Sequence, residues 1–359
     1  MVTFTRFLYC YDEVVLNLLF ALLERKDFKE VIFWFTEIFH SGFLRELTEL
    51  IWTFYYDFYA LYSNIPFYKL NGKLNKFKKS NDIIPILECL NIFFQSEPHC
   101  EIFIITRMLK LKRVHKITNI ENVFKIIESA IANKKIYHVI NYLNAAITQD
   151  EETTIKHYNI FIQKINNKKI TLFKKNTKNT FPQLINHLFK NTNLNINKVK
   201  KKRIKYIPLS NTYIEYYNDL IASNCIQSSI LQEKRHYGIR NVTGLFTLKR
   251  DKLKTPISEV FWYNWEYYSK NTPFWKEKFN KYNVKWDNKN IVFANDDKLE
   301  EFYEKHSYEL DELPYNISHK SIKEFDKNLL ILDFLYKYFK TINLPLQKNK
   351  IDIKRRIQY

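Results

Sequence analysis

The chain has 359 residues, of which 46% are hydrophobic and 17% aromatic, so it can bury a large core and is not a disordered chain. At roughly 100–200 residues per domain, this length predicts two domains or three. The formal net charge of +19 favours a polyanionic partner such as nucleic acid, an acidic protein surface or an anionic membrane. The abundance of Lys, Asn, Ile, Tyr and Phe beside only 4 Gly is typical of an A+T-rich coding sequence, which by itself supplies some of the lysine.

The positive charge is concentrated in the middle of the chain. Residues 1–70 have a net charge of −3, residues 71–255 of +20, and residues 256–359 of +2. Residues 153–214 contain 14 Lys and Arg and no Asp or Glu. A compositional drift would spread the excess evenly, so this distribution favours a binding role for the middle segment.

Cysteine spacing and hydropathy indicate in which kind of compartment the protein is located. The spacing of the four cysteines matches no disulfide framework, which predicts a reducing compartment. The longest nearly apolar run, 14–23, has ten residues, whereas a membrane span needs about 20. Because Asp12 and Glu13 precede this run and no cleavage motif follows it, we expect neither a membrane span nor a signal peptide.

The N-terminal part has strong helical periodicity. Apolar spacing predicts helices over 12–23, 28–40, 43–61, 82–94, 97–110, 121–132 and 136–146. Gly42 follows the second of these and can adopt the left-handed conformation that ends a helix. The many aromatic residues of the first three helices are expected in the core rather than on a base-stacking surface. The lysine-rich residues 73–79 are predicted to be a basic linker.

The later chain has weaker patterns. In the acid-free stretch we expect a helix over 155–165, a strand over 169–174, a loop over 176–180, a helix over 181–189 and an exposed arm over 198–205. Beyond it we expect helices over 213–230, 256–268, 275–282, 296–306 and 321–339, a strand over 242–248, a hairpin over 284–293 with a four-residue loop at 287–290, and a basic tail over 348–356.

These patterns predict a mainly α protein. A helical N-terminal domain occupies residues 1–150, and a basic, partly ordered segment follows over 151–211. A smaller α+β domain with the hairpin occupies 212–340, and the tail covers 341–359.

No established catalytic motif is present. Neither G-x-x-x-x-G-K nor G-x-G-x-x-G occurs, which excludes the usual phosphate-binding loops of P-loop and Rossmann enzymes. Cys89, His99 and Cys100 lack the C-x₂₋₄-C pair of a structural zinc site, so Cys89 is expected in the core. The sequence therefore predicts no metal site and no cofactor.

An acidic helix carries the remaining candidate for chemistry. Asp296, Asp297, Glu300, Glu301 and Glu304 are spaced to share a helical face. Such a face can hold Mg²⁺, so a metal-dependent nuclease using Asp296, Asp297 and Glu300 stays an alternative. The favoured interpretation is a solvated face, which could also contact the basic segment within the chain or between copies.

The basic segment has three interpretations. It is a nucleic-acid contact strip, a protein-binding or assembly arm, or a solvated surface of a lysine-biased chain. Because Lys far outnumbers Arg, the first would act by attraction to phosphates rather than by reading bases, with Phe173, Phe181 and Tyr206 available for stacking. The candidate nucleic-acid-binding residues are Lys174, Lys175, Lys178, Lys198, Lys200, Lys201, Lys202, Arg203 and Lys205.

Short phrases at both ends of the chain resemble an uncharacterised protein family of giant nucleocytoplasmic large DNA viruses. They lie at 11–15, 24–26, 33–34, 41–43, 55–60, 262–268, 273–275, 299–303 and 308–312. The resemblance covers residues 11–60 and 235–312 and includes no catalytic signature. It implies a virus that replicates in a eukaryotic cytoplasm, and it transfers no functional residue.

The leading hypothesis is a non-enzymatic viral nucleic-acid-binding protein of replication, transcription or packaging. The alternative is a virion structural or assembly protein whose basic segment binds acidic faces of neighbouring viral proteins. Either would be located in the host cytoplasm, at the viral factory, or in the virion.

Overall fold

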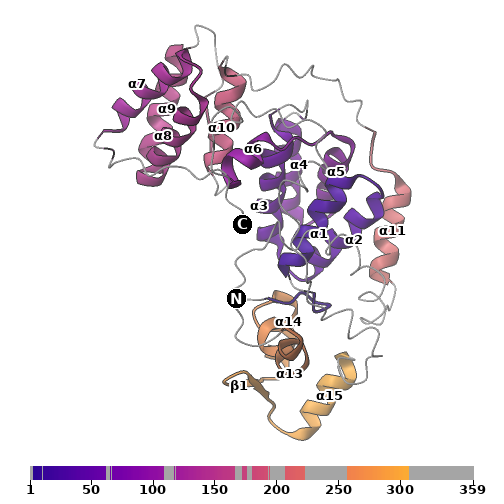
Figure 1. Ribbon diagram of the computed structural model, residues 1–359. Helices are drawn as coiled ribbons and strands as arrows, with labels where there is room; N and C mark the ends of the chain where they lie inside the picture. Colours follow the sequence, from indigo (N-terminus) through magenta and orange to yellow (C-terminus); the bar gives the residue numbers. More distant parts are fainter. Residues whose placement is uncertain are drawn as a thin grey trace.

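The computed structural model of the chain is mainly α-helical, as predicted (Figure 1). The structure describes residues 3–9, 11–61, 65, 67–108, 117, 119–165, 172–175, 180–192, 194, 207–222 and 257–306. Within these ranges the β-structure amounts to one two-stranded sheet. The expected arm over 198–205, strand over 242–248, helix over 321–339 and tail over 348–356 lie outside them. No helix that the structure describes has both the length and the apolar character needed to cross a membrane.

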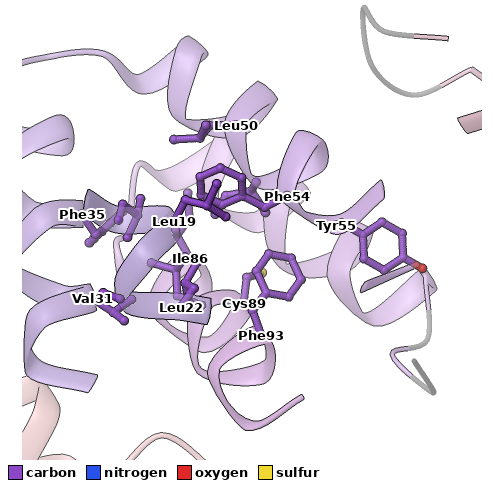
Figure 2. Packing of buried hydrophobic residues seen from close by; sticks show 14 of the residues in the cluster. Leu19, Leu22, Val31, Phe35, Leu50, Phe54, Tyr55, Ile86, Cys89 and Phe93 are labelled. Atoms are coloured by element: carbon purple, nitrogen blue, oxygen red, sulfur yellow. The ribbon is translucent and has the colours of Figure 1, made fainter. Parts of the chain in front are cut away.

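A first hydrophobic core joins the N-terminal helices. It is built from α1 (Tyr11–Glu24), α2 (Phe28–His40), α3 (Leu44–Phe54), η1 (Tyr55–Tyr59), α4 (Phe67–Ser80) and α5 (Ile84–Gln95). Phe54, Cys89 and Phe93 are among the residues at its centre (Figure 2). Trp34 and Phe58 are also buried, so the aromatic residues here form core, as expected.

Local signals set the ends of α2. The Asp27 carboxylate accepts a hydrogen bond from the Lys29 amide at 2.9 Å, which satisfies one of the free amides at the helix start. Gly42 follows the helix with φ +90°, a conformation that side chains other than glycine rarely adopt. A Cβ at this position would also lie 2.5 Å from the Pro273 side chain, so this turn contacts the C-terminal part of the chain.

Residues 73–79 are not a linker; the prediction was wrong. They lie within α4, which runs from Phe67 to Ser80. Leu70, Leu74 and Phe77 are spaced four and three residues apart and are buried in the first core. Since Lys is a good helix former, three anchoring side chains suffice to keep this lysine-rich stretch helical.

A second core crosses the expected domain boundary at residue 150. It joins α6 (Glu101–Phe103), η2 (Ile104–Met108), α7 (Ile120–Ala132), α8 (Ile136–Gln149), α9 (Glu151–Ile165) and α10 (Thr180–Asn191). Tyr158 of α9 and Leu184 of α10 are buried with Val139 of α8. Within the acid-free stretch, the described parts of α9 and α10 are therefore packed into this core.

The strand expected over 169–174 is not observed in residues 172–174. The Phe173 amide donates to the Asn159 side-chain oxygen at 2.8 Å, and the Asn159 side-chain nitrogen donates to the Phe173 carbonyl at 3.2 Å. One side-chain amide thus satisfies both backbone groups, which removes the need for a neighbouring strand.

The C-terminal unit forms a third, smaller core. It contains α13 (Ile257–Ser269), α14 (Pro273–Lys281), β1 (Lys285–Asp287), β2 (Asn290–Val292) and α15 (Asp296–His306), together with Phe4 and Leu8. The predicted hairpin is present, but Asp287 pairs with Asn290, so its loop has two residues and not four. Asn288, with φ +53°, makes this tighter turn.

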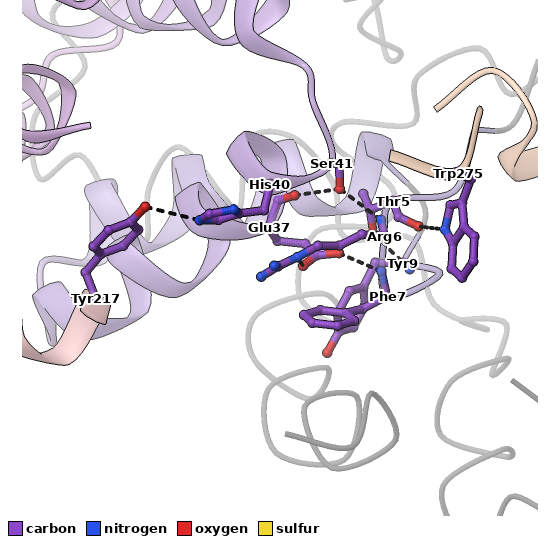
Figure 3. A network of polar contacts seen from close by, with 9 residues as sticks. All are labelled: Thr5, Arg6, Phe7, Tyr9, Glu37, His40, Ser41, Tyr217 and Trp275. Atoms are coloured by element: carbon purple, nitrogen blue, oxygen red, sulfur yellow. Dashed lines mark hydrogen bonds and ion pairs between the residues drawn. The ribbon is translucent and has the colours of Figure 1, made fainter. Parts of the chain in front are cut away.

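Helix α11 (Asn211–Ala222) packs against the first core. The Phe28 and Tyr213 rings lie 4.9 Å apart between centroids, and the Tyr217 hydroxyl is 3.1 Å from His40 Nε2 (Figure 3). The unit expected to begin at residue 212 therefore starts with a helix that covers α2.

A polar junction holds the N-terminal segment against α2 and α14 (Figure 3). The Arg6 guanidinium forms a 3.0 Å ion pair with Glu37, whose second oxygen accepts from the Phe7 amide at 3.0 Å. The Trp275 indole donates to the Thr5 carbonyl at 3.1 Å. The first and last described parts of the chain are thereby joined.

Candidate nucleic-acid interface

The structure places only two of the nine predicted contact residues. Lys198, Lys200, Lys201, Lys202, Arg203, Lys205 and Lys178 lie outside the described residues. Lys174 is exposed, and Lys175 forms a 2.7 Å ion pair with Glu151. The Lys175 ammonium and the Thr180 hydroxyl hold the pKa of Glu151 below its usual range. Lys175 is exposed, but its charge is thus partly neutralised by Glu151.

A basic surface that the sequence reasoning missed lies on α4. Tyr68, Gly72, Lys76 and Lys79 are four, four and three residues apart, which places them along one side of the helix. This stripe, called the α4 face here, is exposed and lies opposite the buried Leu70–Leu74–Phe77 side. Treating 73–79 as a linker hid it, although the apolar spacing of 70, 74 and 77 already signalled a helix.

The α4 face is uncompensated by acid. The helix has five lysines and no Asp or Glu. Lys73 bridges to Glu88 of α5, whereas Lys76, Lys78 and Lys79 form no ion pair with another described residue. Lys78 and Lys79 are in the last turn, where a cation also interacts favourably with the helix dipole, but that does not account for Lys76.

Gly72 sits in the middle of this face. Glycine in an exposed helix interior costs about 1 kcal/mol relative to alanine. Nothing lies within 4 Å of the point where a Cβ would be. Between Tyr68 and Lys76 the helix backbone is therefore open to close approach by a ligand.

A side-chain clamp fixes the chain that follows the lysine-rich run. The Gln95 amide donates to the Ile207 carbonyl at 2.8 Å and accepts from the Ile207 amide at 2.8 Å. Asn91 adds a second donor to the same carbonyl at 3.1 Å. An amide side chain can satisfy both backbone groups because it carries a donor and an acceptor. No signal in the sequence indicates this contact, since its partners are 112 residues apart.

The clamp holds the residue just after the lysine-rich run on the helix next to α4. Ile207 comes two residues after Lys205, and it is held on α5, the helix that packs against α4 (Figure 1). On the other side of the run, Leu194 is 3% exposed in the second core. The chain carrying the lysines is therefore attached to the folded protein at both of its ends.

The alternative chemical sites gain no support. Among the residues that the structure describes, no group of three or more His, Cys, Asp or Glu side chains is placed to hold a metal ion. On α15, Glu301 forms a 2.6 Å ion pair with Lys298 and accepts from the Tyr282 hydroxyl at 3.3 Å. Cys89 is buried in the first core, as expected, and burial raises the pKa of its thiol.

No protein-family model, no curated protein and no solved structure matches the chain. Function is therefore inferred from the geometry of the described residues. Within them, the α4 face combines exposed lysines, the absence of acid and an exposed aromatic ring.

Proposed function

We propose that this protein binds nucleic acid without catalysing a reaction on it, using the exposed lysines of α4 together with the lysine-rich run 198–205. The observation that carries the proposal is that Lys76, Lys78 and Lys79 are exposed, on a helix without acid, and not paired with any other described residue. Such ammonium groups attract phosphates and release counterions on contact, largely independently of base sequence.

The composition of α4 favours nucleic acid over the assembly alternative. Interfaces between proteins are depleted of Lys and enriched in Arg, because Lys is strongly hydrated and makes no planar two-bond contact. All five cations of α4 are Lys. The proposed setting is the viral factory or the virion, as the sequence resemblance implies. Mass spectrometry of purified particles tests that setting, and hundreds of copies per particle would favour the structural role instead.

The test is a salt titration of binding to duplex and single-stranded DNA and RNA. The wild type is compared with a triple variant, Lys76→Gln, Lys78→Gln and Lys79→Gln. The matched control is Lys125→Gln, Lys164→Gln and Lys298→Gln, which removes the same charge from lysines that are paired with Glu121, Glu128 and Glu301.

If each α4 lysine makes one duplex phosphate contact, the α4 triple variant flattens the plot of log affinity against log salt by about 2–3. The control triple leaves that slope near the wild-type value. Absence of wild-type binding at about 50 mM salt would refute the function, because phosphate contacts are strongest there. Equal effects of the two triples would refute the assignment to α4.

A further inference from the structure

Tyr68 is far more exposed than the large aromatic residues of the first core, on which its helix packs. Trp34, Phe58 and Tyr59 are buried there, whereas Tyr68 is 70% exposed. Its ring forms no aromatic or cation–π contact with another described residue. A large π-surface is thus offered to solvent on the same stripe as Lys76 and Lys79.

A supported ring lies beside Tyr68. Phe67 is 43% exposed and stacks on Trp52, with centroids 5.4 Å apart and planes inclined by 27°. Trp52 stacks in turn on Tyr56 at 5.9 Å. Since Trp52 is buried, Phe67 is backed by fixed rings, and the start of α4 is held in place.

The spacing along α4 suits an extended polyanion. Eight residues separate Tyr68 from Lys76, which is about 12 Å along a helix axis, and Gly72 lies halfway with open space above it. A chain lying along the stripe would meet an aromatic ring at one end and ammonium groups at the other. Gly72 leaves no side chain to hold its backbone away.

A ring of this kind discriminates between nucleic-acid forms. In a duplex the faces of the bases are covered by their neighbours, so an exposed tyrosine gains nothing from them. In a single strand each base has an open face that can stack on an aromatic side chain, whatever its sequence. The lysines, in contrast, attract the phosphates of both forms.

We propose that the α4 face binds single-stranded nucleic acid in preference to duplex, with a base stacked on Tyr68 and phosphates on Lys76 and Lys79. This rests on the proposed function and specifies its ligand. The recognition is independent of sequence, because stacking and phosphate attraction are open to every nucleotide.

Exposed tyrosine alone is not sufficient, and the chain contains its own control. Tyr263 on α13 is 77% exposed. Glu259 lies four residues before it on the same helix, and α13 contains no lysine. Tyr263→Ala therefore removes the same side chain from an acidic setting.

The experiment measures the affinity of the full chain for a labelled single strand and for a duplex with the same number of phosphates, at about 100 mM salt. Tyr68→Ala, Tyr68→Phe, Tyr263→Ala and the wild type are compared, with thermal unfolding as the check on folding. We expect Tyr68→Ala to lower single-strand affinity about tenfold and duplex affinity less than twofold, with an unchanged salt slope. Tyr68→Phe retains the ring and binds as the wild type does, and Tyr263→Ala is unaffected.

The outcomes distinguish a failure of the single-strand preference from a failure of nucleic-acid binding itself. Wild-type binding that favours duplex, or a Tyr68→Ala effect that is absent or equal for both forms, overturns the single-strand preference while leaving phosphate binding intact. Loss of single-strand affinity in Tyr263→Ala overturns the assignment to Tyr68. Binding of neither form by the wild type overturns the proposed function itself.

Discussion

Two regions of the molecule carry exposed lysines and differ in what surrounds them. On the second core, Lys125, Lys164 and Lys175 lie 3.6, 3.1 and 2.7 Å from glutamate oxygens. On α4 the helix has no acid. An exposed ion pair contributes only about 0–1 kcal/mol to stability, but it cancels the field of its lysine. The difference teaches that the position of the acids, more than the number of lysines, marks a surface for a polyanion.

The largest expected effect concerns the run 198–205, which lies outside the described residues and belongs to neither region. We expect Lys200→Glu, Lys201→Glu and Lys202→Glu together to reduce duplex affinity by about two to three orders of magnitude near 100 mM salt. The salt slope should flatten by about 2–3. Thermal unfolding should stay unchanged, because the sequence predicts an exposed arm here and exposed substitutions shift stability by less than about 0.5 kcal/mol each. Unchanged affinity would show that the run is a bystander; loss of the thermal transition would show that it is packed.

Acid should weaken the fold through two half-buried histidines, one in each of two cores. Burial, then the Arg6 charge, lowers the pKa of His40 to about 4; burial, then nearby lysines, lowers that of His306 to about 4. Both are neutral in the folded protein, whereas the unfolded chain binds protons below about 6.5. Stability is therefore complete above pH 6.5 and falls toward pH 4, by on the order of 2–3 kcal/mol in all once solvent screening is allowed for.

Urea unfolding at pH 7.5, 5.5 and 4.5 measures this loss. His40→Gln should flatten the dependence, since one of the two groups is removed.

The clamp on Ile207 should have a smaller effect, of two kinds. Gln95→Ala removes two hydrogen bonds of 2.8 Å and should destabilise the protein by about 1–2 kcal/mol. It should also weaken nucleic-acid binding several-fold, because Ile207, two residues after the lysine-rich run, is no longer held on α5. The control is Gln149→Ala, which removes a 2.7 Å bond to the Ile117 carbonyl in the second core. Equal binding losses in the two variants would count against a positioning role for Gln95.

The sequence was a good guide where the signals are local. The helices Phe28–His40 and Asp296–His306 were predicted to the residue, because apolar spacing and end residues such as Gly42 lie within or beside them. It failed for α4, where a high lysine content masked the spacing of Leu70, Leu74 and Phe77. The domain boundaries and the clamp depend on which distant segments meet, and no local pattern encodes that.

For the candidate site, too, the sequence predicted one part and missed another. Its lysines were visible as a charge excess over residues 71–255, but their pairing was not. Whether Lys164 meets Glu128 depends on the packing of α9 against α7, and whether Tyr68 is exposed depends on which side of α4 is buried. Composition therefore locates the charge, and only the fold shows where it is uncompensated.

The smallest expected effect comes from freeing the paired lysines of the second core, so that they resemble the unpaired lysines of α4. Glu121→Gln with Glu128→Gln removes the partners of Lys125 and Lys164 without adding a lysine. If ion pairing with glutamate is what keeps these lysines from binding nucleic acid, the freed ammonium groups should raise the affinity for nucleic acid at about 50 mM salt by roughly two- to fivefold. Stability should change by less than about 1 kcal/mol, since both lysines of these pairs are largely exposed. Lys164→Gln, which removes the other member of one pair, should leave affinity within about twofold of wild type. If freeing the lysines changes nothing, the acids are not what separates the two regions, and the special position of α4 would have to come from Tyr68 and Gly72 alone.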